Sequence, residues 1–213
     1  EQLHLAIKDS HRIQKQSGID FPEVDILAIW KQVIEQMLQN NMIQWKTYRE
    51  PLDDLAMLIV EYVTRVEEPS IMPNFEEAVL DLHERRIKLG IVSNAQFYSI
   101  LTLEALLPAD LWNVIFPVAD LQFWSFEQKI AKPSATFFQR AADQLSSAYG
   151  IKASQSLFVG NDMLKDIYAS AKAGFKTALF AADKRSLKYR ENDERCNNLI
   201  PDTVVTDYKQ FIQ

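Results

Sequence analysis

The chain has 213 residues, of which 47% are hydrophobic and 24% are charged; this composition can bury a core and excludes disordered and low-complexity proteins. Its 23 basic and 29 acidic residues leave a formal charge of −6, so no overall positive field would attract nucleic acid or an anionic membrane. The single cysteine, Cys196, excludes an internal disulfide framework and a zinc site built on several thiolates. No run approaches the roughly 18 apolar residues of a membrane-spanning helix, and the first residues do not resemble a signal peptide. We therefore expect a soluble, cytoplasmic protein.

The N-terminal third of the chain predicts helices only. Apolar residues recur at helical spacing over 3–13, again from Val24 to Met42, and a third time from Pro51 to Val63. The acidic, Pro-containing stretch at 67–73 then predicts a linker. We expect an all-helical domain over residues 1–70.

From residue 71 onwards, helical patterns alternate with short apolar runs. The runs predict buried strands at 88–93, 113–118, 157–160, 177–180 and 203–206. Helix alternating with buried strand predicts an α/β fold for residues 71–213, with a Rossmann-like, mostly parallel sheet and helices on both of its faces.

Ligands of an open parallel sheet bind beyond the carboxyl ends of its strands, so the residues that follow each run are the candidate site. Ser93 and Asn94 end the first run and offer a hydroxyl and an amide; the same residue types are also common helix caps and turn residues. Lys132 stands before Pro133 at the start of a helix, where a lysine by itself indicates only a surface position.

Asp162 and Asp166 follow the run that ends at Gly160. Four residues apart, they would share one face of a helix and could hold a hard cation such as Mg²⁺ through oxygen ligands. The alternative is an ordinary helix cap followed by an acidic first turn.

Together, these motifs resemble those of the haloacid-dehalogenase-like (HAD) hydrolase superfamily, over the core from about Pro73 to Phe180. The resemblance implies that Ser93 and Asn94 bind phosphate, that Lys132 stabilises the phosphoryl group and the nucleophile, and that Asp162 and Asp166 hold Mg²⁺. The helical domain at 1–70 resembles the α-helical cap of one large subgroup. Trp45, Tyr48 or Arg49 could face the cleft of such a cap, but nothing in the sequence orients them, and packing in the core or at the surface is the better interpretation.

One family motif is not found in this sequence. The family's nucleophile is the first Asp of an Asp-x-Asp-x-Thr/Ser motif that ends a central strand, between the strands ending here in Ser93 and Gly160. Asp9 is an early candidate, but His11 stands two residues later and the segment has helical spacing. Two unpaired strand edges inside a sheet are costly, so we expect a further N-terminal strand and loop in the native molecule.

The resemblance implies a Mg²⁺-dependent phosphatase that acts on a small phosphorylated metabolite through an aspartyl-phosphate, as a monomer or homodimer. A haloacid dehalogenase, a non-catalytic interaction protein and an inactive fragment are the alternatives. Elsewhere, Lys184, Arg185, Lys188 and Arg190 precede acidic residues and predict a mixed surface face.

Overall fold

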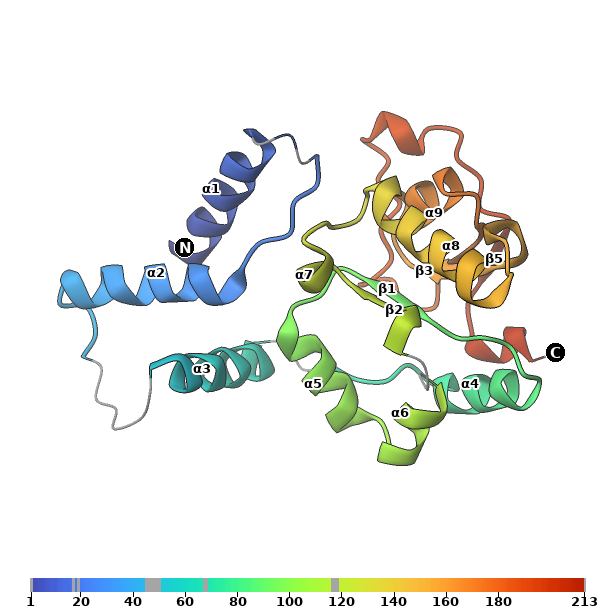
Figure 1. Ribbon diagram of the computed structural model, residues 1–213, viewed down its shortest axis with the longest axis horizontal. Helices are drawn as coiled ribbons and strands as arrows, with labels where there is room; N and C mark the ends of the chain where they lie inside the picture. The colour runs from blue at the N-terminus through green and yellow to red at the C-terminus, as the bar shows by residue number, and fades with distance from the viewer. Residues whose placement is uncertain are drawn as a thin grey trace.

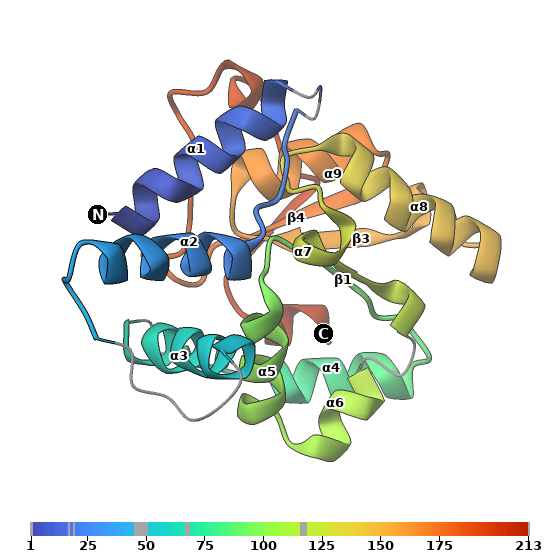
Figure 2. The same ribbon diagram turned by 60° about the vertical axis from the view of Figure 1, so that its left-hand side comes forward.

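The computed structural model describes residues 2–16, 18, 20–44, 51–66, 69–115 and 119–212. Three helices form the N-terminal part: α1 (Gln2–Gln16), α2 (Ile26–Gln39) and α3 (Pro51–Val66). They lie beside the strand-containing part of the molecule (Figure 2). Among the described residues, no helix is long and apolar enough to cross a membrane.

Helix α2 is the central member of the N-terminal group, since it packs against both α1 and α3. The carboxylate of Asp25 caps its start by accepting from the Ala28 N–H at 3.0 Å. Ile29 and Val33 are buried along α2, and the ring of Trp30 meets Tyr62 of α3 edge-on at 5.1 Å. The amphipathic pattern seen in the sequence thus forms a helix–helix interface. The predicted domain boundary at residue 70 stays a prediction.

The rest of the chain alternates helices with parallel strands (Figure 1). Its strands are β1 (Ile91–Ser93), β2 (Gln122–Trp124), β3 (Leu157–Gly160), β4 (Lys176–Phe180) and β5 (Thr203–Val205). Between them lie longer helices and short helical turns: α4 (Phe75–Glu84), α5 (Phe97–Leu106), α6 (Ala109–Ile115), η1 (Ala119–Leu121), α7 (Ser125–Gln128), α8 (Ala135–Tyr149), η2 (Ala153–Gln155), η3 (Met163–Tyr168), α9 (Ala169–Lys172), η4 (Glu194–Cys196) and η5 (Tyr208–Phe211).

Every strand pairing among the described residues is parallel, but the strands form two sheets instead of one. β1 pairs with β2, whereas β3, β4 and β5 form a second sheet in that order. No described strand pairs with the second edge of β1 or of β3, although Val92 and Phe158 pack against the same apolar cluster. The predicted single sheet is therefore split between β1 and β3.

Side chains alternate along β4, so both faces of the second sheet are covered. Leu179 packs with Met163 and Ile167 of η3. Its neighbour Phe180 points the other way, where its ring lies 4.4 Å from that of Tyr208 in η5. This agrees with the predicted α/β architecture.

The predicted strand at 113–118 is wrong for the part that the structure describes. Residues 113–115 lie in α6, and 116–118 fall outside the described residues. Short apolar runs do not by themselves separate a buried helix from a strand, and here Leu111 and Trp112 pack the helix against Val79 of α4. The strand lies later, at β2, where Phe123 and Trp124 are buried.

Phe138 of α8 is the side chain with which this core can be tested. It is fully buried and meets Phe158 of β3 edge-on at 4.7 Å. We expect Phe138→Ala to lower the free energy of unfolding by about 3–5 kcal/mol, because the cavity adds to the lost burial. Leu101→Ala, at a position 49% exposed, is the control and should change it by less than about 1 kcal/mol. Equal denaturation midpoints for the two variants would contradict this packing.

Candidate active site

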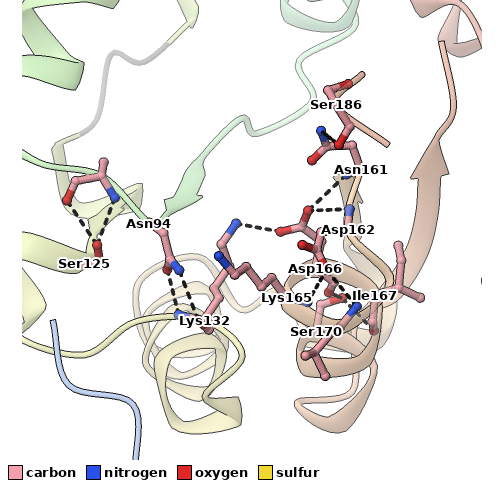
Figure 3. A network of polar contacts seen from close by, with 12 residues as sticks. Asn94, Ser125, Lys132, Asn161, Asp162, Lys165, Asp166, Ile167, Ser170 and Ser186 are labelled. Carbon is pink, nitrogen blue, oxygen red and sulfur yellow. Dashed lines mark hydrogen bonds and ion pairs between the residues drawn. The ribbon is translucent and has the colours of Figure 1, made fainter. Parts of the chain in front are cut away.

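The carboxyl ends of β1 and β3 carry the residues that the sequence singled out. Ser93 is the last residue of β1 and is half-buried; within the described part of the chain its hydroxyl has no hydrogen-bond partner. The side chain of Asn94 makes two hydrogen bonds to the backbone of Lys132: Nδ2 donates to the Lys132 carbonyl at 3.0 Å, and the Lys132 N–H donates to Oδ1 at 2.7 Å. Asn94 therefore positions Lys132 against the end of β1 (Figure 3).

Lys132 and Asp166 form a buried ion pair beside β3. Nζ of Lys132 lies 2.6 Å from Oδ1 of Asp166, and the two side chains are 12% and 6% exposed. Nζ also lies 5.5 Å from the ring centre of Phe158. The second carboxylate oxygen of Asp166 accepts the N–H groups of Asn161 and Asp162, both at 3.0 Å. Asp166 thus links Lys132, and through it β1, to the turn that follows β3.

Gly160 allows this close approach. A Cβ on Gly160 would lie 2.4 Å from Cγ of Asp166, a contact that no side chain tolerates. The turn after it is π-helical: over Met163–Tyr168 the chain makes a wider turn than an α-helix, and the Ile167 N–H reaches the Asp162 carbonyl five residues back at 3.2 Å. π-Turns often occur at functional sites, and this one directs Asp166 back toward the end of β3.

Asp162 is buried but faces a different cation. Its Oδ1 accepts the N–H groups of Leu164 and Lys165, and Arg190 binds its carboxylate through Nε at 3.1 Å and Nη2 at 2.5 Å. Arg190 is held there because the Lys188 backbone pairs with Asn161 and Met163. Arg190 lies at the surface, as predicted, with its side chain 37% exposed. Its fork-shaped guanidinium also closes on a buried carboxylate, which a charge pattern alone does not reveal.

The environment of Asp162 lowers the pKa of its carboxyl group. Burial alone raises this pKa, but the hydrogen bonds and charge of Arg190, together with the N–H groups of Lys165 and Leu164, outweigh burial and hold the pKa below its ordinary value of 3.8. The carboxylate is thus ionised at neutral pH, with its charge offset within the protein.

Asp162 and Asp166 are the described residues that could contribute oxygen ligands to a Mg²⁺ ion at this site. Asp162 and Asp166 supply the carboxylate oxygens that this cation prefers. However, the described residues contain no group of three His, Cys, Asp or Glu side chains that could hold a metal, and each carboxylate already binds a cation of the chain. The two residues alone therefore do not complete a magnesium site, and Arg190 would have to release Asp162 before it could act as a ligand.

A cleft of about 540 Å³ opens between α1 and this group of residues. Asn94, Lys132 and Lys165 line it from the strand-containing side, and His11 and Lys15 line it from α1. Trp45, Tyr48 and Arg49, for which core or surface packing is the better interpretation of the sequence, lie outside the described residues. His11, Lys15 and Lys165 were not predicted, because residue type and spacing do not show which helix faces the cleft.

Glu23 fixes the segment that joins α1 to α2 against the end of β1, another contact that the sequence did not predict. Its carboxylate accepts hydrogen bonds from Nε2 of Gln96 and from the Val24 N–H, both at 2.9 Å, and from the hydroxyl of the buried Ser125. Ser125 in turn accepts the Ala95 N–H at 2.9 Å. One wall of the cleft is therefore held by hydrogen bonds between residues distant in sequence.

The ion pair of Asp162 and Arg190 predicts a pH-dependent stability. We expect Arg190→Gln to lower the free energy of unfolding at pH 7 by about 1–3 kcal/mol, because Asp162 keeps a buried charge while the 37% exposed Arg190 limits the loss. The lowered pKa stabilises the fold above about pH 4, and this contribution disappears as pH falls through the pKa of the folded state. The difference in free energy of unfolding between wild type and Arg190→Gln should therefore shrink below about pH 4.

The measurement is denaturant unfolding at a series of pH values. Arg185→Gln is the matched control, since Arg185 lies in the same loop, is 94% exposed and approaches Asp183 only to 3.7 Å. A difference between wild type and Arg190→Gln that stays constant down to pH 2, or that Arg185→Gln reproduces, would contradict the assigned ion pair.

Known proteins share this architecture. The ribulose-1,5-bisphosphate 5-phosphatase of Halopiger xanaduensis is 28% identical over 136 residues, which make up 64% of this chain and 53% of that protein; the match thus spans about half of its length. A dehalogenase solved with an intermediate complex superposes with a TM-score of 0.58 at 15% identity, covering 98% of this chain and 79% of the other. A putative HAD hydrolase of Bacillus subtilis bound to magnesium gives 0.54 at 14% identity, covering 98% and 89%.

At these identities the solved structures show a common fold and no more. The family is shown by the sequence itself, because the family model described as haloacid dehalogenase-like hydrolase matches residues 4–180. That range includes the carboxyl ends of β1 and β3 and both residues of the Lys132–Asp166 ion pair. The chain belongs to the haloacid dehalogenase-like hydrolase family.

Proposed function

We propose that this hydrolase is a phosphatase that acts on a small phosphorylated molecule at the end of the cleft where Ser93 and Lys132 lie. The observation that carries the proposal is the fixed ammonium of Lys132, which lines a cleft in which its partner Asp166 and its anchor Asn94 hold it in place. A preorganised cation of this kind stabilises negative charge as it develops on a reacting phosphoryl group. The relative named as a ribulose-1,5-bisphosphate 5-phosphatase supports phosphate as the group removed.

Ser93 and Lys132 have separate tasks in this proposal. The Ser93 hydroxyl, at the end of β1, donates to a phosphoryl oxygen. Lys132 offsets the charge of both the phosphate and the attacking carboxylate, which otherwise repel each other. Asn94 and Asp166 act through Lys132: one holds its backbone and the other its ammonium group. Loss of either should move Lys132 rather than remove a group that touches the substrate.

The nucleophile is proposed to come from a strand that lies between β1 and β3. Neither strand has a partner on this edge among the described residues, and each ends in a residue of the site. A parallel strand inserted there would pair with both edges and place its own carboxyl end between Ser93 and Asp166. An Asp at that position would attack phosphorus and form the aspartyl-phosphate as the P–O bond to the substrate's alcohol breaks and that alcohol leaves. Water would then hydrolyse the aspartyl-phosphate, which releases inorganic phosphate and restores the carboxylate.

Asp162 and Asp166 are the residues proposed to hold Mg²⁺, together with ligands on the inserted strand. When bound, the cation would offset charge between the nucleophilic carboxylate and the phosphate. The hard oxygen chemistry of the two carboxylates supports this role. Asp162 would bind the cation only after Arg190 releases it.

A metal-independent haloacid dehalogenase is the second candidate. The observation that favours it is that Asp162 is already neutralised by Arg190, so the turn after β3 is electrostatically complete without a metal. Both candidates use an Asp nucleophile, on phosphorus in one case and on carbon in the other. Their requirement for Mg²⁺ separates them. Cytoplasmic location and a monomeric or homodimeric state remain predictions.

The test is hydrolysis of p-nitrophenyl phosphate by the full-length protein with Mg²⁺ and with EDTA. We expect Mg²⁺-dependent turnover that Lys132→Met lowers by about 100-fold or more, because the stabilising charge is lost. Lys172→Met, on the exposed side of α9, is the control and should retain activity. Ser93→Ala is a second test, since it leaves the ion pair of Lys132 and Asp166 intact.

Two results would contradict the phosphatase. One is phosphate release that Lys132→Met and Ser93→Ala leave unchanged. The other is no phosphate release at all, together with chloride release from 2-chloropropanoate in EDTA, which would identify the dehalogenase.

A further inference from the structure

The cleft is lined by basic side chains other than that of Lys132. Lys15, Lys132 and Lys165 line it, together with His11, whereas Glu23 is the acidic residue among those that line it. Glu23 accepts hydrogen bonds from the neutral donors Ser125 and Gln96 and keeps its negative charge, whereas Lys132 is paired with Asp166. Two ammonium groups, those of Lys15 and Lys165, therefore remain.

Lys165 lies next to Asp166 in the sequence but has no role in the phosphoryl-transfer site proposed above. Its backbone N–H donates a hydrogen bond to Oδ1 of Asp162. Its side chain is half-buried and makes no ion pair with any carboxylate among the described residues. Figure 3 shows this side chain extending from η3 toward the side of the site where Lys132 lies. The ammonium group of Lys165 thus lines the cleft without a carboxylate partner among the described residues and is available to an anionic ligand.

Lys15 approaches the same cleft from the opposite wall. It is four residues after His11 on α1, so the two side chains share one face of that helix, and both line the cleft. Lys15 likewise has no ion-pair partner among residues 2–16, 18, 20–44, 51–66, 69–115 and 119–212. Two unpaired lysines thus face a shared volume of about 540 Å³ from separate elements.

We propose that Lys165 and Lys15, with His11, form a second anion subsite, so that the substrate carries two anionic groups. The group to be hydrolysed binds at Ser93 and Lys132, and the second, a phosphate or a carboxylate, binds between η3 and α1. This inference rests on the proposed function for the identity of the first group. The subsite itself rests on the unpaired cations of the cleft, and it binds its ligand whether or not hydrolysis follows.

Non-hydrolysable probes test the subsite in the full-length protein. Isothermal titration calorimetry would compare pentylphosphonate with pentane-1,5-diylbisphosphonate and 6-phosphonohexanoate, which share a chain and differ in the second group. We expect the bisphosphonate to bind at least tenfold more tightly than pentylphosphonate. A matching gain for 6-phosphonohexanoate would show that the subsite takes a carboxylate as well, and a gain for the bisphosphonate alone would show that it takes a phosphate.

Charge-removing variants locate the subsite. Lys165→Gln and Lys15→Gln should each reduce the preference for the bisphosphonate by about 3- to 10-fold and leave the affinity for pentylphosphonate unchanged. Lys8→Gln is the matched control: Lys8 lies on the same helix, α1, but does not line the cleft, so this variant should keep the full preference.

The proposal is overturned if the two phosphonates bind wild type equally, or if the preference survives in both Lys165→Gln and Lys15→Gln. These failures differ from a failure of the phosphatase. Turnover of p-nitrophenyl phosphate without a bisphosphonate preference would reject the subsite alone. A lysine-dependent preference without turnover would reject the phosphatase alone.

Discussion

The buried contact between Lys132 and Asp166 joins the two halves of the strand-containing part of the molecule. β1 and β3 do not pair with each other, so the ends of these strands are related by side chains rather than by a ladder of backbone hydrogen bonds. Asn94 ties Lys132 to β1, and Asp166 ties it to the turn after β3. Removing one member of such a buried pair leaves an uncompensated charge. The position of the candidate catalytic lysine thus depends on an interaction that also joins the two sheets, beside the apolar cluster against which Val92 and Phe158 both pack.

The same geometry explains why much of the fold was predictable and where prediction failed. The runs at 157–160, 177–180 and 203–206 form strands because each is short, apolar and bounded by polar turns. The run at 113–118 has the same local character, but residues 113–115 belong to a helix that packs on α4. Only contacts with residues distant in sequence separate the two cases.

Candidate site residues show a similar division. Ser93, Asn94, Lys132 and Asp166 were singled out because they follow strand ends or start a helix, and the structure joins the last three in one hydrogen-bonded group. The residues that approach this group from elsewhere in the chain were not predictable. Arg190 binds Asp162 from a loop, and Lys15 lines the cleft from helix α1. Such contacts depend on how elements pack, which spacing along the sequence does not encode.

The central claim is that phosphate is transferred to a carboxylate on a strand between β1 and β3, beside Lys132. The most direct measurement is mass spectrometry of peptides from the full-length protein, quenched in acid during turnover of p-nitrophenyl phosphate with Mg²⁺. The account predicts one phosphoryl adduct, on an Asp of the strand proposed to pair with the edges of β1 and β3. An adduct on Asp162 or Asp166, or turnover without any phosphorylated peptide, would contradict it.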